Sequence, residues 1–151
     1  MRAIVVTDQA AGTAGMTLGE RHEPQAAIND VVVQVHASGF VPTELTWPST
    51  WTDRLDRDRT PSIPGHEVAG VVTALGYGTT GLSVGQRVFG LTDWTRDGTP
   101  AEYAAVEARN LAPLPGAQEF VDLDKMRSKT SAASIWCSMS SAATSESDPR
   151  A

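Results

Sequence analysis

Short apolar stretches separated by turn residues dominate roughly the first 115 residues of this chain. In Asp30–Ala37 the apolar side chains occupy alternating positions, which is the pattern of a half-buried strand. Val68–Leu75 is almost wholly apolar and predicts a more deeply buried strand. Further strands are predicted at Met1–Thr7, Gln86–Leu91 and Ala101–Val106. Short strands at irregular intervals predict a mainly β fold, a barrel or a sandwich.

Helical structure has room in one place only, at Pro42–Trp51. Pro42 can occupy the first position of a helix, where its missing N–H costs nothing. Pro48 would clash within a longer helix, so any helix here is expected to be short.

The hydrophobic pattern stops near Pro115. Eight of the twenty residues from Ser128 to Ser147 are serine, and no apolar periodicity continues there. Such a segment buries too little apolar surface to offset the entropy cost of ordering it. Residues 125–151 are therefore expected to form an irregular, disordered tail.

Length and charge exclude several classes of partner. With 151 residues the chain can form one well-buried domain, and its net charge of −6 argues against nucleic acid or an anionic membrane as partner. No apolar run approaches the ~20 residues that span a bilayer, and the first residues are too soon polar for a signal peptide. The expectation is a cytoplasmic protein. The single cysteine, Cys137, excludes an internal disulfide and a multi-thiolate zinc site within one chain.

A histidine and a glutamate enter an apolar strand directly after a Pro-Gly turn, in the run from Ser62 to Val72. Burying such groups costs several kcal/mol unless they are partnered, so His66 and Glu67 are candidate functional residues. Two interpretations stay open. The pair either supplies a metal ligand or a polar group in a carbonyl-binding cleft, or His66 is a hydrogen-bonded histidine at a strand entrance. The two other histidines show no ligand-like spacing to His66.

Hydroxyl, carboxylate and indole groups lie close together in Gly39–Trp47. Thr43, Glu44 and Trp47 could line a substrate pocket. Equally, Thr43 and Glu44 could form the solvated first turn of a short helix with Trp47 in the core, and the residues alone favour this second interpretation.

The segment Gly76–Gly81 matches the G-x-G-x-x-G fingerprint of dinucleotide-binding proteins. That motif binds phosphate only where a strand ends and a helix begins. Here a glycine and β-branched residues follow, so the sequence predicts a turn into another strand, and no phosphate site.

Five segments together resemble the amino-terminal, GroES-like domain of the medium-chain dehydrogenase/reductase superfamily. They are Met1–Ala3, Asp30–Gly39, Pro64–Gly70, Gly85–Gly90 and Thr99–Tyr103. The greatest likeness is to zinc-free, quinone-oxidoreductase-like members that use NADPH. The resemblance implies a GroES-like barrel with short helices over residues 1–115, followed by an irregular tail.

The resemblance also implies a chemistry and a set of site residues. Zinc-free relatives transfer hydride from NADP(H) to an enone or a quinone, while polar groups stabilise the developing negative oxygen. The implied catalytic residues are Thr43, His66 and Glu67, and the implied substrate-cleft residues are Phe40, Val41, Glu44 and Trp47. Zinc-dependent members carry a cysteine at the position that Val41 holds here, so no zinc is expected.

One part of the family pattern is missing. The nucleotide-binding half would follow Pro115, but residues 116–124 resemble a strand from well inside that half, as a remnant would. The 151-residue chain alone is therefore expected to bind no NADP(H) and to be inactive. The alternative is a non-catalytic module that binds a partner or self-associates through an exposed face of the domain.

The serine-rich tail has two possible origins. Codons for residues 131–151, read one frame away, can encode a sequence resembling the family's next strand and loop. The single codons of Trp136 and Met139 both force valine there, where the family has apolar residues. An out-of-frame remnant is favoured over an ordinary disordered tail.

Overall fold

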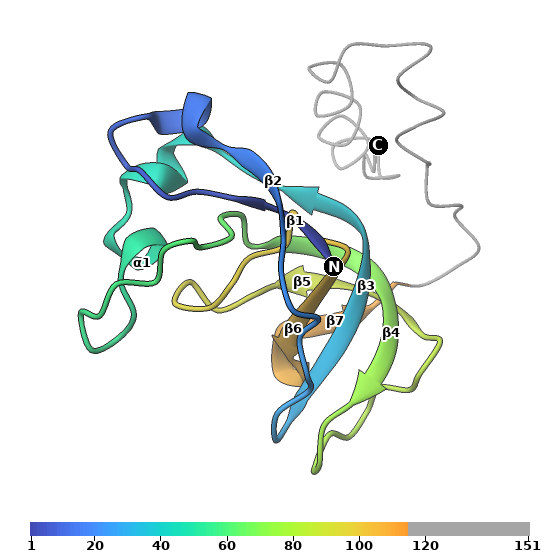
Figure 1. Cartoon of the computed structure of the whole chain (residues 1–151). Helices are drawn as coiled ribbons and strands as arrows, with labels where there is room; N and C mark the ends of the chain where they lie inside the picture. The colour runs from blue at the N-terminus through green and yellow to red at the C-terminus, as the bar shows by residue number, and fades with distance from the viewer. Residues whose placement is uncertain (115–151) are drawn as a thin grey trace, which may run out of the picture. The chain divides into compact units, whose positions relative to one another are not determined.

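The computed structural model describes residues 1–114, which form a mainly β structure with a few short helices (Figure 1). The strands are β1 (Arg2–Val5), β2 (Thr17–Glu20), β3 (Asp30–Gly39), β4 (Glu67–Leu75), β5 (Arg87–Leu91), β6 (Tyr103–Glu107) and β7 (Leu111–Pro113). Three 3-10 helices, η1 (Gly12–Gly15), η2 (Pro42–Thr46) and η3 (Ala108–Asn110), and one helical turn, α1 (Pro48–Trp51), connect them. The mainly β fold expected from the sequence is confirmed.

The strands form two antiparallel sheets. A five-stranded sheet has the order β6-β3-β4-β5-β7, and β1 pairs with β2 in a second, two-stranded sheet. Isolated bridges from Ala3 to Ala101 and from Val6 to Ser62 tie the smaller sheet to the segments that flank the larger one. The two longest strands, β3 and β4, run side by side through the centre of the larger sheet (Figure 1).

Alternation along the strands creates the core. In β4 the side chains of Val68 and Val72 are buried while Glu67 and Thr73 face outward, as the two-residue period of a strand requires. These valines pack in one buried cluster with β3, β5 and β6. A second, smaller cluster joins Ala3 and Val5 of β1 to Ile63.

All five strands expected from the hydrophobic pattern are present, with small shifts at their ends. The last one begins at Tyr103, two residues later than predicted. The expected short helix is split, because η2 ends at Thr46 and α1 starts at Pro48. Trp47 between them has extended backbone angles, which is the conformation that a following proline favours.

The G-x-G-x-x-G segment lies in the turn between β4 and β5. Gly78 and Gly81 take positive φ angles of 82° and 79° there, and the next regular element is strand β5. The prediction of a turn into a strand is confirmed.

The predictions for residues 116–124, for the tail and for Cys137 lie outside the described residues. Within residues 1–114 no helix is long and apolar enough to cross a membrane.

Candidate functional site

A tight turn delivers His66 to the start of β4. Gly65 has a φ of 84°, and a Cβ atom there would lie only 2.8 Å from the ring of Pro100, so glycine is required on two counts. The backbone N–H of Thr92 donates to the carbonyl of His66 at 2.8 Å, which fixes the turn against the segment after β5.

The His66 side chain is only 3% exposed. Its Nδ1 lies 3.1 Å from the hydroxyl of Thr92, and its Nε2 lies 3.8 Å from a carboxylate oxygen of Glu44. That second distance is too long for a hydrogen bond, and Nε2 has no hydrogen-bond partner within residues 1–114. The ring is therefore held on one side and faces a carboxylate on the other.

Glu44 is also buried, and its carboxylate is held by backbone N–H groups. Oε1 accepts from Val41 at 3.1 Å, in the manner of a residue that caps its own helix. Oε2 accepts from Gly65 at 2.9 Å, so Glu44 joins η2 to the turn that carries His66.

Two tryptophans enclose the imidazole. Trp47 lies nearly parallel to it, with ring centres 6.3 Å apart and an interplanar angle of 12°. Trp94 packs edge-on against it, with ring centres 4.7 Å apart and an interplanar angle of 61°. The two indoles also pack edge-on, with ring centres 5.0 Å apart and an interplanar angle of 73°. We call Trp47, His66 and Trp94 the aromatic cluster. Trp94 is 46% exposed, so the cluster has a face open to solvent.

The surroundings of His66 favour the neutral imidazole. Burial lowers the pKa of His66 below its ordinary value, and the positive charge of Arg59 lowers it further. The carboxylate of Asp93 opposes both but only partly offsets them.

The structure brings together three of the residues expected from sequence, namely His66, Glu44 and Trp47. The interpretation in which Glu44 is solvated and Trp47 lies in the core is wrong, because Glu44 is buried and Trp47 only half-buried. A buried carboxylate is favourable here because two N–H groups bind it.

The other expected site residues lie at or near the surface. Thr43 is exposed in η2, Val41 precedes it with 48% exposure, and Phe40 is half-buried. Glu67 is exposed, and its carboxylate lies over Gly39 on the neighbouring strand. Adjacent strand residues point to opposite faces, so the carboxylate of Glu67 and the buried ring of His66 do not meet.

Trp94 was not singled out from the sequence. It lies in a loop 28 positions beyond His66, and no local pattern links the two. The signal that could have found it is its place three residues after the end of β5, next to a Thr-Asp pair.

The residues around His66 do not fit a zinc ion. Within residues 1–114 no group of three or more His, Cys, Asp or Glu side chains lies close enough to hold a metal. His66 and Glu44 offer two ligand atoms, whereas a catalytic zinc needs three protein ligands. The absence of zinc from the protein stays a prediction.

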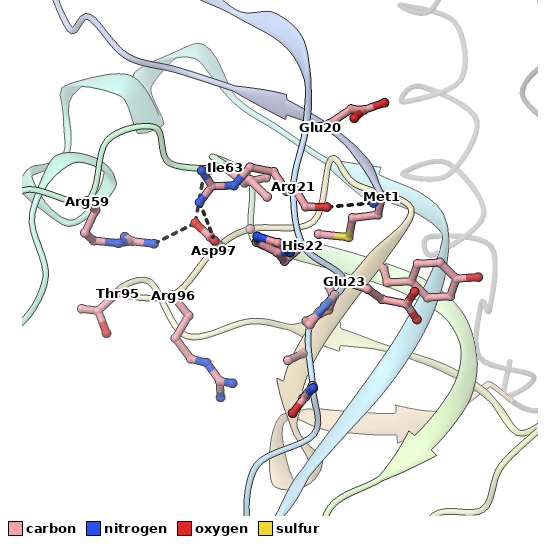
Figure 2. A pocket seen from close by; sticks show the side chains of 16 residues that line it. Met1, Glu20, Arg21, His22, Glu23, Arg59, Ile63, Thr95, Arg96 and Asp97 are labelled. Atoms are coloured by element: carbon pink, nitrogen blue, oxygen red, sulfur yellow. Dashed lines mark hydrogen bonds and ion pairs between the residues drawn. The ribbon is translucent and has the colours of Figure 1, made fainter.

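A cavity of about 1090 Å³ lies elsewhere, lined by charged side chains (Figure 2). None of the seven expected site residues lines it. The aromatic cluster and this cavity are therefore separate features of the molecule.

Comparison with known proteins supplies the context for this geometry. Residues 27–116 match the alcohol dehydrogenase GroES-like domain family. The chain is 41% identical over 91 residues to an L-threonine 3-dehydrogenase of Saccharopolyspora erythraea, a match that covers 60% of this chain and 25% of that protein. It is 35% identical over 92 residues to a human quinone oxidoreductase, covering 61% and 27%.

Solved structures show the same family relationship. An alcohol dehydrogenase superfamily protein from Novosphingobium aromaticivorans is 34% identical with a TM-score of 0.64, covering 80% of this chain and 36% of that one. A mycobacterial protein solved in complex with NADPH is 26% identical with a TM-score of 0.64, covering 79% and 35%. The matched segment spans about a quarter of the length of these two curated relatives.

Proposed function

The chain belongs to the alcohol dehydrogenase GroES-like domain family, and from this premise we propose that residues 1–115 are the amino-terminal, substrate-binding domain of an NADPH-dependent oxidoreductase. Its substrate is a quinone, an enone or a related carbonyl compound. The observation that carries the proposal is the aromatic cluster, in which a neutral, buried imidazole and a fixed carboxylate lie beneath partly exposed indoles.

We propose that two of the catalytic residues, Thr43 and Glu67, contact the substrate directly. Thr43 and Glu67 are exposed, and the hydroxyl of Thr43 can donate to the oxygen on which negative charge develops during hydride transfer. His66 is buried, so we assign it a positioning role. It packs against both indoles and faces the carboxylate of Glu44.

The remaining cleft residues supply the apolar surroundings. Phe40 and Val41 come directly before η2, and Trp47 directly follows it, so all three lie close to Thr43 along the chain. Apolar walls exclude water and strengthen the hydrogen bond from Thr43 to the developing oxyanion.

The cofactor proposal rests on the family and on the relative solved with NADPH. NADPH supplies the hydride when bound, and family enzymes hold it on a parallel sheet. Every strand pair in residues 1–114 is antiparallel. We therefore propose that the 151-residue chain assayed alone has no oxidoreductase activity, because residues 1–114 form no parallel sheet to hold the nicotinamide against the substrate. We also propose that the protein works without zinc.

A chimera tests the proposal. Residues 1–115 of this chain replace the matching segment of the human quinone oxidoreductase, and NADPH oxidation is followed with duroquinone as acceptor. We expect duroquinone-dependent turnover, and Thr43→Val should lower kcat/KM about 100-fold because one oxyanion donor is lost.

The matched control is Thr17→Val, which removes an exposed hydroxyl from β2 and should leave kcat/KM unchanged. A folded chimera that binds NADPH but reduces neither duroquinone nor an enone contradicts the proposed substrate class. Turnover by the unmodified 151-residue chain contradicts the proposed inactivity.

A further inference from the structure

The charged cavity of Figure 2 contains three arginine side chains. Arg21 follows β2, Arg59 precedes β4, and Arg96 lies in the loop between β5 and β6. Three segments that are far apart in sequence thus bring guanidinium groups to one cavity, together with the carboxylate of Asp97.

One of these arginines is fully paired. Arg96 donates to both carboxylate oxygens of Asp30, at 3.1 and 2.6 Å. This bidentate contact raises the pKa of Arg96. The charge of Arg96 is therefore compensated within the protein.

Arg21 and Arg59 are not compensated in this way, because they share one carboxylate. Asp97 lies 3.5 Å from Arg21 and 3.6 Å from Arg59, which are ion-pair distances without a hydrogen bond. Within residues 1–114, Arg59 donates one hydrogen bond, to the carbonyl of Ser49, and the guanidinium of Arg21 donates none. Each guanidinium has five N–H donors.

Burying the positive charge costs more at Arg59 than at Arg21, because the Arg59 side chain is only 11% exposed and that of Arg21 is 29% exposed. Burial lowers the pKa of Arg59 and outweighs the carboxylates of Asp97, Asp53 and Asp93. Since an arginine in a protein does not deprotonate, a buried positive charge remains beside an open cavity.

We propose that this cavity binds a small oxyanion, a carboxylate or a phosphate group, between the guanidinium groups of Arg21 and Arg59. Guanidinium groups match the oxygen spacing of both kinds of anion. Asp97 is the internal competitor for these donors, and Glu20 and Glu23 on the cavity wall limit the site to a small anion. The argument for this site does not rest on the proposed oxidoreductase activity.

The test is a titration of the 15N-labelled chain with sodium phosphate and, separately, sodium acetate. The side-chain Nε–H signal of Arg59 is the reporter, and sodium chloride at matched ionic strength is the control. Thermal shifts are avoided because phosphate stabilises most folded proteins without binding a site. We expect a saturable shift with at least one oxyanion and none with chloride. The tighter of the two identifies the ligand class.

Three variants sharpen the test. Arg21→Gln should weaken binding about tenfold, because charge-assisted hydrogen bonds are lost. Asp97→Asn should strengthen it, because the competing carboxylate is removed. Arg109→Gln is the control, since Arg109 is 79% exposed and does not line the cavity.

The opposite signs expected for Arg21→Gln and Asp97→Asn separate site binding from a general effect on folding. A shift that grows linearly without saturation overturns the proposal. Equal affinity in Arg21→Gln and Arg109→Gln also overturns it. Either result leaves the quinone assay of the chimera unaffected, so the two proposals fail separately.

Discussion

At the scale of single residues, His66 links the candidate site to the stability of the fold. Its folded pKa is lowered by burial and by Arg59, so the unfolded chain binds a proton more readily than the folded one. Stability is then complete above the unfolded pKa of about 6.5 and declines as the pH falls from there toward the lowered folded value.

This dependence gives a prediction for urea unfolding between about pH 5 and 7.5. The free energy of unfolding should fall toward acid, with His66 contributing at most about 1.4 kcal/mol per pH unit. His66→Asn should flatten this slope, because it removes the buried imidazole of the aromatic cluster. An unchanged slope in His66→Asn would show that His66 is not the group that titrates.

Residue roles were only partly predictable from sequence. The sequence singles out His66 because titratable groups rarely enter apolar segments without partners, and Glu44 because it lies close in sequence to Thr43 and Trp47. The 3.8 Å approach between them depends on how η2 folds against the Pro64–Gly65 turn, and no local pattern encodes that contact. Trp94 was missed for the same reason, because only the tertiary fold brings it to His66.

At the scale of elements, the ion pair between Asp30 and Arg96 joins β3 to the loop before β6. Asp30, at the start of β3, is 3% exposed and is held by both terminal nitrogens of Arg96. Its backbone carbonyl also accepts from the hydroxyl of Thr79 in the β4–β5 turn. Three segments therefore meet at this one residue.

Asp30→Asn should lower the free energy of unfolding by about 3 kcal/mol, because it leaves the Arg96 charge without its carboxylate. The matched control is Glu102→Gln, which breaks the exposed pair with Arg2 and should lower the free energy of unfolding far less than Asp30→Asn does. Urea titrations of both variants give the comparison. Equal losses would mean that the Asp30 pair contributes no more than a surface pair.

Long strands could be predicted from the sequence more easily than short ones. β3 and β4 are long enough to show an alternating pattern or a continuous apolar run in the sequence. β2 has only four residues and β7 three, which is too short for such a pattern. Such short strands exist because a partner strand already presents free N–H and C=O groups. The break between η2 and α1 at Trp47 is explained by Pro48, since the residue before a proline avoids helical backbone angles.

At the scale of the whole molecule, the described domain carries two separate features. The aromatic cluster lies where η2, the Pro64–Gly65 turn and the loop after β5 meet. The charged cavity of Figure 2 lies between the segment after β2 and the loop before β6. Family membership supports the proposed role of the aromatic cluster in oxidoreductase chemistry. The proposed anion site in the cavity rests only on the charges of its lining residues.

The central claim is that the exposed face of the aromatic cluster binds a quinone or a related carbonyl compound. The most direct measurement follows the indole N–H signals of the 15N-labelled chain during titration with duroquinone. The account predicts saturable shifts at Trp47 and Trp94. Trp51 should not move, because its indole N–H is bonded to the carbonyl of Leu45 at 2.8 Å and it is not part of the cluster. Unmoved signals from Trp47 and Trp94, or equal shifts at Trp51, would contradict the account.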